Sequence, residues 1–233
     1  MTETPEYLRG NMELYIDSAD TFAIREMVTI LPVNGVTTNP SLVAKSGVEL
    51  THLISDIRTI LGEEKLIFAQ VLASDTPNII REAQYLHEMC ANMIVKIPVN
   101  RAGLAAMTQL KQRNIPTLGT AVYSTSQAML AAFAGADYIA PYFNRMENNN
   151  INAKQAISDI QQFIQLHKMD CKILAASFKN TTQVADCLLA GAAAVTLPVD
   201  VMCEMFNSPL AKHAIDDFSH DWNRAFNRQQ LII

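Results

Sequence analysis

The sequence lacks the features that mark several large classes of protein. No run of about 18 apolar residues occurs in the 233-residue chain, so no membrane-spanning helix is expected. The 18 Lys and Arg residues are outnumbered by 23 Asp and Glu residues and are scattered, which argues against nucleic acid or an acidic membrane as a partner. The first residues contain no apolar core of a targeting segment. We therefore expect a soluble, cytoplasmic protein that binds neither nucleic acid nor membranes.

Cysteine and histidine are also sparse. The five histidines have no metal-ligand spacing, and no CxxC pair occurs among the four cysteines, which are Cys90, Cys171, Cys187 and Cys203. Isolated cysteines of this kind are commonly reduced and buried as small apolar side chains. The sequence thus predicts no metal site.

Short apolar runs typical of β-strands are abundant. Eight of them recur at intervals of roughly 20 to 35 residues, separated by segments with helical periodicity, and they span residues 13–17, 35–39, 67–72, 93–99, 116–122, 138–142, 172–177 and 194–199. The first and last runs are as apolar as the others, so neither resembles an exposed sheet edge, and closure into a barrel removes edges. We predict an α/β fold, a single eight-fold β/α (TIM) barrel over residues 12–207.

Two segments lie outside this predicted barrel. Residues 1–11 are expected to be a mobile extension. Residues 208–233 are expected to form a C-terminal helix and tail, because Ser208 and Pro209 can start a helix with one apolar face, formed by Ile215, Phe218, Trp222 and Phe226. That face can pack on its own barrel or on a neighbouring subunit, and the pattern alone does not separate the two.

Lys96 is the one charge in the apolar run of residues 93–99. Burying an unpartnered ammonium costs several kcal/mol or more, so such a lysine has a partner, a lowered pKa or a chemical task. The neutral amine is the nucleophilic form, which an apolar pocket favours and a Schiff-base lysine needs. The simpler alternatives are an ion pair with a barrel carboxylate or a side chain that reaches out to water.

Polar residues lie at or just after the carboxyl end of every predicted strand. Side chains alternate along a strand, so Lys96 can point into the barrel with Ile94 and Pro98. Since active sites of such barrels lie at this end, the expected site is a ring formed by Asp17, Thr37, Asn39, Gln70, Lys96, Thr120, Tyr142, Arg145, Ser177, Lys179 and Asp200.

Each ring member also has a simpler role. Asp17 can cap the following turn, Thr37 can be an ordinary β-branched strand residue, and Asn39 can shape the loop before Pro40. Gln70 is harder to explain in this way, because a buried amide in an apolar strand needs partners for both its oxygen and its nitrogen.

Six segments resemble the short transaldolase family and, within it, the fructose-6-phosphate aldolase group. They are ELYID at 13–17, GVTTNPS at 35–41, VKIPV at 95–99, TLGTAVY at 117–123, APYFNR at 140–145 and AASFK at 175–179. The resemblance covers residues 12 to about 228. It implies that Lys96 forms a Schiff base with a ketose or dihydroxyacetone, that Asp17 assists proton transfer, and that Tyr142 is the acid or base beside a water positioned with Gln70 and Thr120.

The resemblance also implies how the substrate is held. Thr37 and Asn39 would bind the hydroxyls of the donor, and a phosphate would be bound by Arg145, Ser177 and Lys179. The substrates would be sugar phosphates and dihydroxyacetone, with no metal or organic cofactor, because the imine is itself the electron sink. Family members commonly form pentamers or decamers in which the C-terminal helix reaches a neighbour, so a homo-oligomer is expected.

Two residues separate the activities found in the family. Transaldolases typically have Glu where this chain has Gln70 and Phe where it has Tyr142. We therefore predict a class I aldolase, an aldehyde-lyase that reversibly cleaves fructose 6-phosphate or a similar ketose to dihydroxyacetone and glyceraldehyde 3-phosphate. One alternative is a transaldolase of the pentose phosphate pathway, which transfers the dihydroxyacetone unit from sedoheptulose 7-phosphate or fructose 6-phosphate. A more distant one is a non-catalytic sugar-phosphate-binding barrel in which Lys96 is ion-paired to Asp17.

Overall fold

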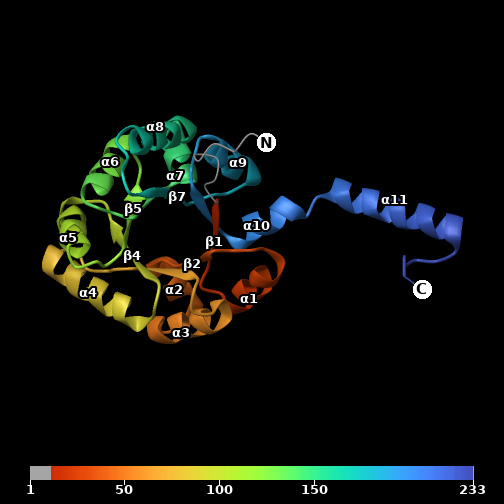
Figure 1. The fold of residues 1–233 in the computed structure, drawn as a ribbon, viewed down its shortest axis with the longest axis horizontal. Helices are drawn as coiled ribbons and strands as arrows, with labels where there is room; N and C mark the ends of the chain where they lie inside the picture. The colour runs from red at the N-terminus through yellow and green to blue at the C-terminus, as the bar shows by residue number, and fades with distance from the viewer. Residues whose placement is uncertain (1–11, 233) are drawn as a thin grey trace, which may run out of the picture.

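Eight parallel strands close into a barrel in the computed structural model, which describes residues 12–232 (Figure 1). Each strand pairs with the next and β8 pairs with β1; the strands are β1 (Glu13–Asp17), β2 (Gly35–Thr37), β3 (Leu66–Gln70), β4 (Met93–Pro98), β5 (Thr117–Val122), β6 (Tyr138–Pro141), β7 (Lys172–Ala175) and β8 (Ala194–Leu197). The predicted TIM barrel with an additional C-terminal helix is confirmed. The expected extension at residues 1–11 lies outside the described residues.

The described residues also form eleven helices, of which all but α11 lie around the strands (Figure 1). They are α1 (Thr21–Ile30), α2 (Pro40–Ser46), α3 (Leu50–Leu61), α4 (Thr76–Met89), α5 (Arg101–Lys111), α6 (Thr125–Phe133), α7 (Phe143–Asn148), α8 (Ala153–Leu166), α9 (Thr181–Leu189), α10 (Val199–Phe206) and α11 (Pro209–Phe226). Short polar side chains start many of them: Asp20, Asn100 and Asn180 accept hydrogen bonds from backbone N–H groups of the first turn. At these positions the sequence therefore marks where the strand-to-helix loop ends.

Alternation along the strands builds two separate cores. Residues such as Val95 and Ile97 face outward and pack under the helices. The inward-facing residues fill the barrel itself with a second cluster of Tyr15, Phe68, Ile94, Leu118, Tyr138, Ala140, Leu174 and Ala194. Lys96 follows Ile94 by two positions, so it points inward from the top of this cluster, as the alternation predicted.

Six strands end one or two residues earlier than the sequence pattern indicated, and three of these ends have a local reason in the structure. β2 stops at Thr37, because Asn39 caps α2. β3 stops at Gln70, because the backbone N–H groups of Leu72 and Ala73 donate to Glu82. β7 stops at Ala175, and Ser177 then adopts a left-handed backbone conformation with φ of 65°. The residues released from these strands form loops at the mouth of the barrel.

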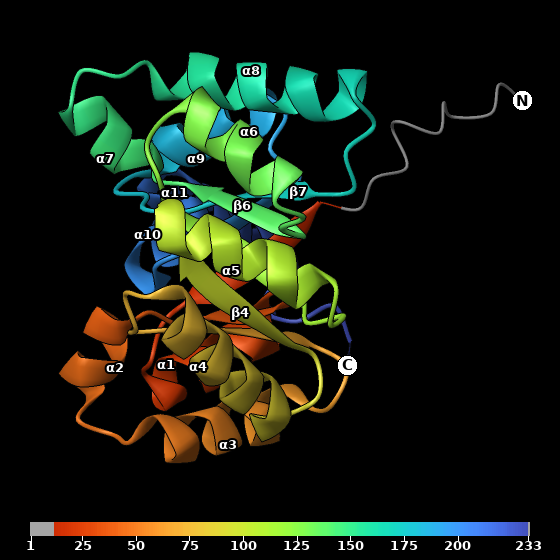
Figure 2. The same ribbon diagram turned by 90° about the vertical axis from the view of Figure 1, so that its left-hand side faces the viewer.

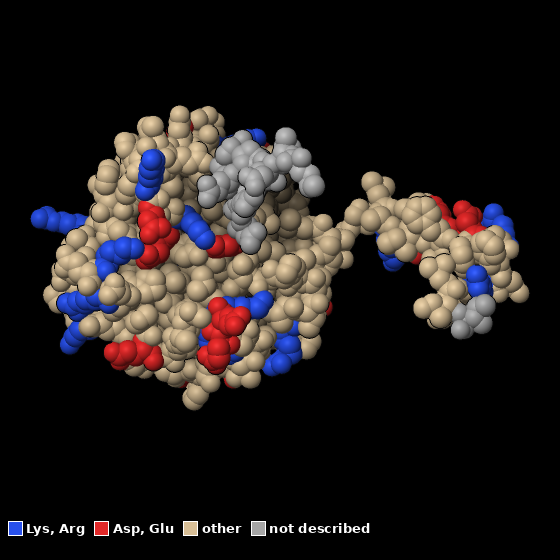
Figure 3. All heavy atoms as spheres, viewed as in Figure 1, with Lys and Arg blue, Asp and Glu red and all other residues tan. Residues whose placement is uncertain are grey.

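α11 extends away from the barrel (Figure 1). Ile215, Phe218 and Phe226 are exposed along it, while Trp222 packs on Phe226 with ring centroids 4.4 Å apart. In this chain the apolar face therefore does not pack on its own barrel. Across residues 12–232, no helix has both the length and the apolar character required to cross a bilayer. On the face drawn in Figure 3, acidic and basic side chains are interspersed.

Candidate active site

The predicted ring residues gather at the carboxyl ends of the strands. In the strand register, Asp17 lies beside Thr37, Gln70 beside Lys96, and Thr120 beside Pro98. Neighbours in register on parallel strands point to the same side of a sheet, so these side chains share the barrel mouth. α2 and α7, which follow two of the strand ends, are on the same, left-hand side of the molecule in Figure 2, α7 above and α2 below.

Lys96 is buried in this mouth, with 5% of its surface exposed. Its Nζ donates to the backbone carbonyl oxygen of Thr38 at 2.6 Å, and no ion pair within 4.0 Å joins it to a carboxylate of residues 12–232. Burial lowers the pKa of Lys96, and the charge of Asp17 opposes that effect in part. The amine neither reaches water nor is neutralised by a direct ion pair, so it is predisposed to the neutral, nucleophilic form.

Thr38 fixes the acceptor of this hydrogen bond, a contact that sequence reasoning missed. Its backbone N–H and its hydroxyl both donate to the carbonyl oxygen of Phe68, at 2.8 Å and 3.0 Å. Because the residue is tied at two points to β3, its own carbonyl is held toward Lys96. A threonine within a β-like run gave no separate signal of this role.

Asp17 is held by a chain of hydroxyls. Its Oδ1 accepts from the Thr37 hydroxyl at 2.8 Å, and that hydroxyl also lies 2.7 Å from the Thr196 hydroxyl. Burial raises the pKa of Asp17, against the opposing effects of the Lys96 charge and the Thr37 hydrogen bond. The simpler role, in which Asp17 caps the following turn, has no supporting contact among residues 12–232: its side chain accepts from Thr37, and the residue that caps α1 is Asp20.

Thr196 is a ring member that sequence reasoning missed. It is 1% exposed on β8, whereas Asp200, the residue predicted to represent this strand, is exposed in the first turn of α10 and accepts from the N–H of Val201. The alternation used for Lys96 could have found Thr196, since it follows the inward-facing Ala194 by two positions.

Tyr142 and Thr120 form a second polar pair in the mouth. Their hydroxyls are 2.9 Å apart. Burial raises the pKa of Tyr142, while the Thr120 hydrogen bond and the Arg145 charge oppose that effect. The Arg145 guanidinium lies 5.0 Å from the centre of the Tyr142 ring and donates to the Tyr123 hydroxyl at 3.4 Å. The phenol is therefore protonated near neutral pH and can donate a proton.

Gln70 and Asn39 present amides to the same region. Gln70 is half-buried, and its side chain has no hydrogen-bond partner among residues 12–232. Asn39 uses its Oδ1 to cap α2, accepting from the N–H of Leu42 at 3.1 Å. Asn39 is therefore the N-cap of α2, and its Nδ2 has no protein partner among residues 12–232. Both amides keep hydrogen-bonding capacity for a ligand.

The three residues predicted to bind phosphate lie on two adjoining segments. The N–H of Asn144 donates to the carbonyl oxygen of Ser177 at 2.8 Å, which joins the start of α7 to the loop after β7. Arg145 and Lys179 are exposed, and Ser177 is half-buried. Within residues 12–232, no hydrogen bond links the three side chains to one another. The structure brings their segments together and leaves the side chains unpaired with each other.

A comparison with protein families matches residues 14–231 to the model described as transaldolase/fructose-6-phosphate aldolase. The chain belongs to this family. The resemblance noted from the six sequence segments is therefore confirmed.

Solved structures outside the family show the same fold. A thiamine phosphate pyrophosphorylase from Pyrococcus furiosus is 15% identical, with a TM-score of 0.59 over 84% of this chain and 89% of that chain. A native KDPGal structure is also 15% identical, with a TM-score of 0.57 over 86% of this chain and 85% of the other. At such identities the similarity supports the barrel and no shared chemistry.

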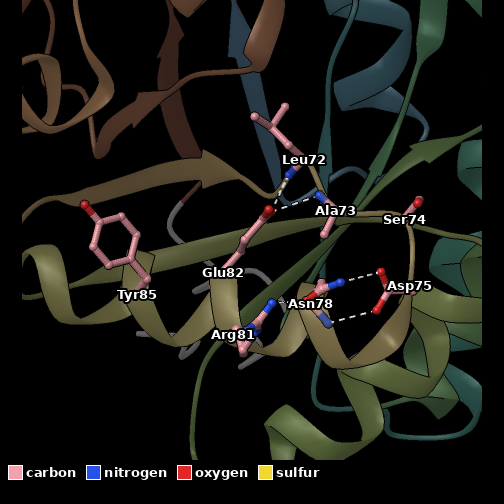
Figure 4. Close-up of a pocket in the computed structure, with 8 residues that line it drawn as sticks. All are labelled: Leu72, Ala73, Ser74, Asp75, Asn78, Arg81, Glu82 and Tyr85. Carbon is pink, nitrogen blue, oxygen red and sulfur yellow. Dashed lines mark hydrogen bonds between the residues drawn. The ribbon is translucent and has the colours of Figure 1, made fainter.

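Beside the mouth, this transaldolase/aldolase family member has a surface cavity of about 600 Å³ at the start of α4 (Figure 4). None of the predicted site residues lines it. Its Glu82 reaches back from α4 and accepts from the N–H groups of Leu72 and Ala73 at 2.6 Å and 2.9 Å. Glu82 therefore fixes the loop that follows Gln70.

Residues able to bind a metal are not clustered among the described residues of this protein. Over residues 12–232, no group of three or more His, Cys, Asp or Glu side chains is placed to hold an ion. The polar groups that the mouth does assemble are an amine, a carboxylate, a phenol, hydroxyls and amides. Such a set can form an imine and move protons around it.

Proposed function

We propose that this chain is a class I aldolase that reversibly cleaves fructose 6-phosphate, or a similar ketose, to dihydroxyacetone and glyceraldehyde 3-phosphate. The observation that carries the proposal is the Lys96 amine, which is buried, hydrogen-bonded to the Thr38 carbonyl and without a carboxylate within ion-pair distance. Family membership supports the same chemistry. The substrate and the balance between cleavage and transfer are part of the proposal.

The first step forms the imine. The Lys96 amine attacks the C2 carbonyl of the ketose, and the carbinolamine loses its hydroxyl as water to give a protonated imine. We assign the proton transfers of this step to Asp17, whose carboxyl group lies at the same end of the barrel and is held by the Thr37 hydroxyl. Thr37 and Asn39 hold the hydroxyls of the donor.

The second step breaks the carbon–carbon bond. A base takes the proton of the C4 hydroxyl, the C3–C4 bond breaks, its electron pair enters the imine to give an enamine, and the aldehyde leaves. Protonation at C3 restores the imine, and water hydrolyses it to dihydroxyacetone and free Lys96. We assign the acid and base role to Tyr142, directly or through a water held with Gln70 and Thr120. Arg145, Ser177 and Lys179 bind the phosphate of the aldehyde.

Gln70 and Tyr142 favour release over transfer. A phenol can protonate the enamine, and its raised pKa keeps it in the donating form. Residue 70 is an amide here, so the carboxylate that transaldolases typically have at this position, which would favour holding the adduct for an acceptor, is missing. A transaldolase would keep the same Lys96 adduct and pass it to erythrose 4-phosphate.

The proposal is tested by incubating the protein with dihydroxyacetone and borohydride, followed by peptide mass analysis. An irreversible adduct on the peptide containing Lys96 is expected. A parallel assay measures cleavage of fructose 6-phosphate with and without erythrose 4-phosphate. Obligatory transfer without release of dihydroxyacetone would make the protein a transaldolase, and the absence of any adduct would favour a non-catalytic sugar-phosphate-binding barrel.

We further propose that α11 packs on a second copy of the chain, giving a homo-oligomer such as a pentamer or decamer. Its apolar side chains are exposed, with Phe218 71% accessible and Phe226 55% accessible, and aromatic stripes of this kind commonly mark interfaces. Sedimentation at micromolar concentration should show an oligomer, and Phe218→Glu should weaken it. A monomer of the unaltered protein would refute this assembly.

A further inference from the structure

Thr196 and Thr37 make a direct hydroxyl contact inside the barrel. Their oxygens are 2.7 Å apart, although the residues are 159 positions apart in sequence. β8 and β2 are the two neighbours of β1, so this contact crosses the interior face of β1. Thr37 is 0% exposed and Thr196 is 1% exposed. Solvent therefore does not compete for these two hydroxyls.

The number of hydrogens available determines which hydroxyl donates in each of these hydrogen bonds. A threonine hydroxyl has one hydrogen to donate and two lone pairs that accept. Thr37 directs its hydrogen to Oδ1 of Asp17, at 2.8 Å. The Thr196 hydroxyl must then supply the hydrogen of the second bond and donate to Thr37. The direction of donation runs from Thr196 through Thr37 to Asp17.

We propose that Thr196 is a positioning residue, whose hydroxyl donates to Thr37 and thereby directs the Thr37 hydrogen onto the Asp17 carboxylate. A hydroxyl that accepts a hydrogen bond becomes a stronger donor in its own bond. Thr196 therefore stabilises the ionised form of Asp17 without touching it. The catalytic consequence rests on the proposed aldolase function, whereas the effect on the Asp17 carboxylate is independent of it.

Two ionisable groups besides the hydroxyls act on this carboxylate. They are Lys96 from β4 and Tyr142 at the end of β6, which are coupled to Asp17 by charge. Neither contacts Thr196 through a hydrogen bond among the described residues. A change at Thr196 should thus reach Asp17 through Thr37 and not through these groups.

The experiment compares Thr196→Val, which keeps the shape and removes the hydroxyl, with Thr196→Ser, which keeps the hydroxyl. Thr117→Val is the matched control, because Thr117 is also 1% exposed but begins β5 at the opposite end of the barrel. The first readout is the ¹³C titration of the carboxyl resonance that Asp17→Asn removes. Thr196→Val should move its midpoint to higher pH, since a weakened hydrogen bond to the carboxylate raises its pKa. Thr196→Ser and Thr117→Val should leave it unchanged.

The second readout is a double-mutant cycle with Thr37→Val. In the unaltered background, Thr196→Val should lower kcat/KM about 10-fold, as expected for one lost buried hydrogen bond. In the Thr37→Val background the same change should have no further effect, because the residue through which it acts is gone. Additive losses, or a lower melting temperature with unchanged titration and kcat/KM, would overturn the proposal.

The two hypotheses fail in distinguishable ways. If the unaltered protein forms the Lys96 adduct but Thr196→Val leaves the Asp17 titration unchanged, only the role of Thr196 is wrong. If the titration shifts but no adduct forms on Lys96, the role of Thr196 in the hydrogen bonds to Asp17 is supported and the aldolase function is refuted.

Discussion

Each end of the barrel interior contains a lysine, a carboxylate and tyrosine, but the lysine and the carboxylate form an ion pair at only one of the two ends. At the amino end, Glu13 accepts hydrogen bonds from the Tyr15 and Tyr138 hydroxyls, at 2.8 Å and 3.0 Å, and forms an ion pair with Lys172. At the carboxyl end, Lys96 and Asp17 form no such pair. The amine donates a hydrogen bond to a backbone carbonyl, and the carboxylate accepts one from a hydroxyl.

This difference separates stability from chemistry. At the amino end the Glu13 carboxylate has an ion pair with Lys172 and two hydrogen bonds from phenols. These interactions offset the free-energy cost of burying its charge. At the carboxyl end burial shifts both pKa values toward the neutral forms, lowering that of Lys96 and raising that of Asp17. A pair kept apart retains the capacity to exchange protons with a substrate. Matched substitutions at the two ends test this contrast.

Lysine replacement should give the largest difference. Lys96→Met should reduce cleavage at least about 1000-fold and abolish the borohydride adduct, because no other amine is buried at the mouth in the described structure. Lys172→Met, at the amino end, should leave kcat within about twofold, since it removes only an ion pair. Steady-state kinetics and peptide mass analysis measure both. Full activity of Lys96→Met would eliminate the mechanism.

Tyrosine replacement should give the next largest difference. Tyr142→Phe should lower kcat about 100-fold, within the range for loss of a general acid or base, while the Lys96 adduct still forms. Tyr138→Phe leaves an acceptor of Glu13 without one partner, so it should cost about 1–2 kcal/mol of unfolding free energy with kcat nearly unchanged. Kinetics and denaturant unfolding separate the two effects. Equal losses of kcat would contradict the assignment.

Carboxylate replacement should shift a pH profile. The charge of Asp17 raises the pKa of Lys96, so Asp17→Asn removes that contribution and lowers the pKa further. The midpoint for imine trapping should therefore move to lower pH, although the rate falls at every pH. Glu13→Gln is the control at the amino end and should not move it. The measurement is the initial trapping rate against pH, and a shift to higher pH would show that Asp17 does not act through charge.

Removing the outer ion pair should have the smallest effect. The Lys172 side chain is 52% exposed, so solvent screens its attraction to Glu13. Lys172→Ala should change the free energy of unfolding by less than about 1 kcal/mol, and by less still in high salt. Urea unfolding at two salt concentrations measures this. A loss of several kcal/mol would mean that the amino end depends on the ion pair more than on its tyrosines.

The barrel and the direction of Lys96 could be predicted from sequence because both depend on local periodicity. Side chains alternate strictly along β4, so Lys96, two positions after the inward-facing Ile94, also points into the barrel. The sequence also identified Asp17, Thr37, Gln70, Thr120 and Tyr142 as neighbours at one end. Their relation follows from the rule that parallel strands present their carboxyl ends together.

Contacts between distant segments could not be predicted in the same way. The Thr38 carbonyl lies within hydrogen-bond distance of Lys96 because Thr38 is hydrogen-bonded to Phe68. No sequence pattern predicts which backbone carbonyl will accept from a buried lysine. The ends of β2 and β3 depend on the Asn39 cap and on Glu82, contacts that compete with strand pairing. Arg145 lies over the Tyr142 ring because Tyr142 is the N-cap of the short helix α7 and Arg145 is in that helix, which the sequence pattern did not identify.

The packed interior beneath Lys96 bears on the order of events in turnover. Tyr15, Phe68 and Leu118 are at most 1% exposed and fill the barrel below the amine, so a molecule can reach Lys96 only from the mouth. In the proposed cleavage, the three-carbon fragment is still covalently attached to Lys96 when the aldehyde is released. The aldehyde must therefore depart first, and the kinetics should be ordered, with dihydroxyacetone as the competitive product inhibitor against the ketose.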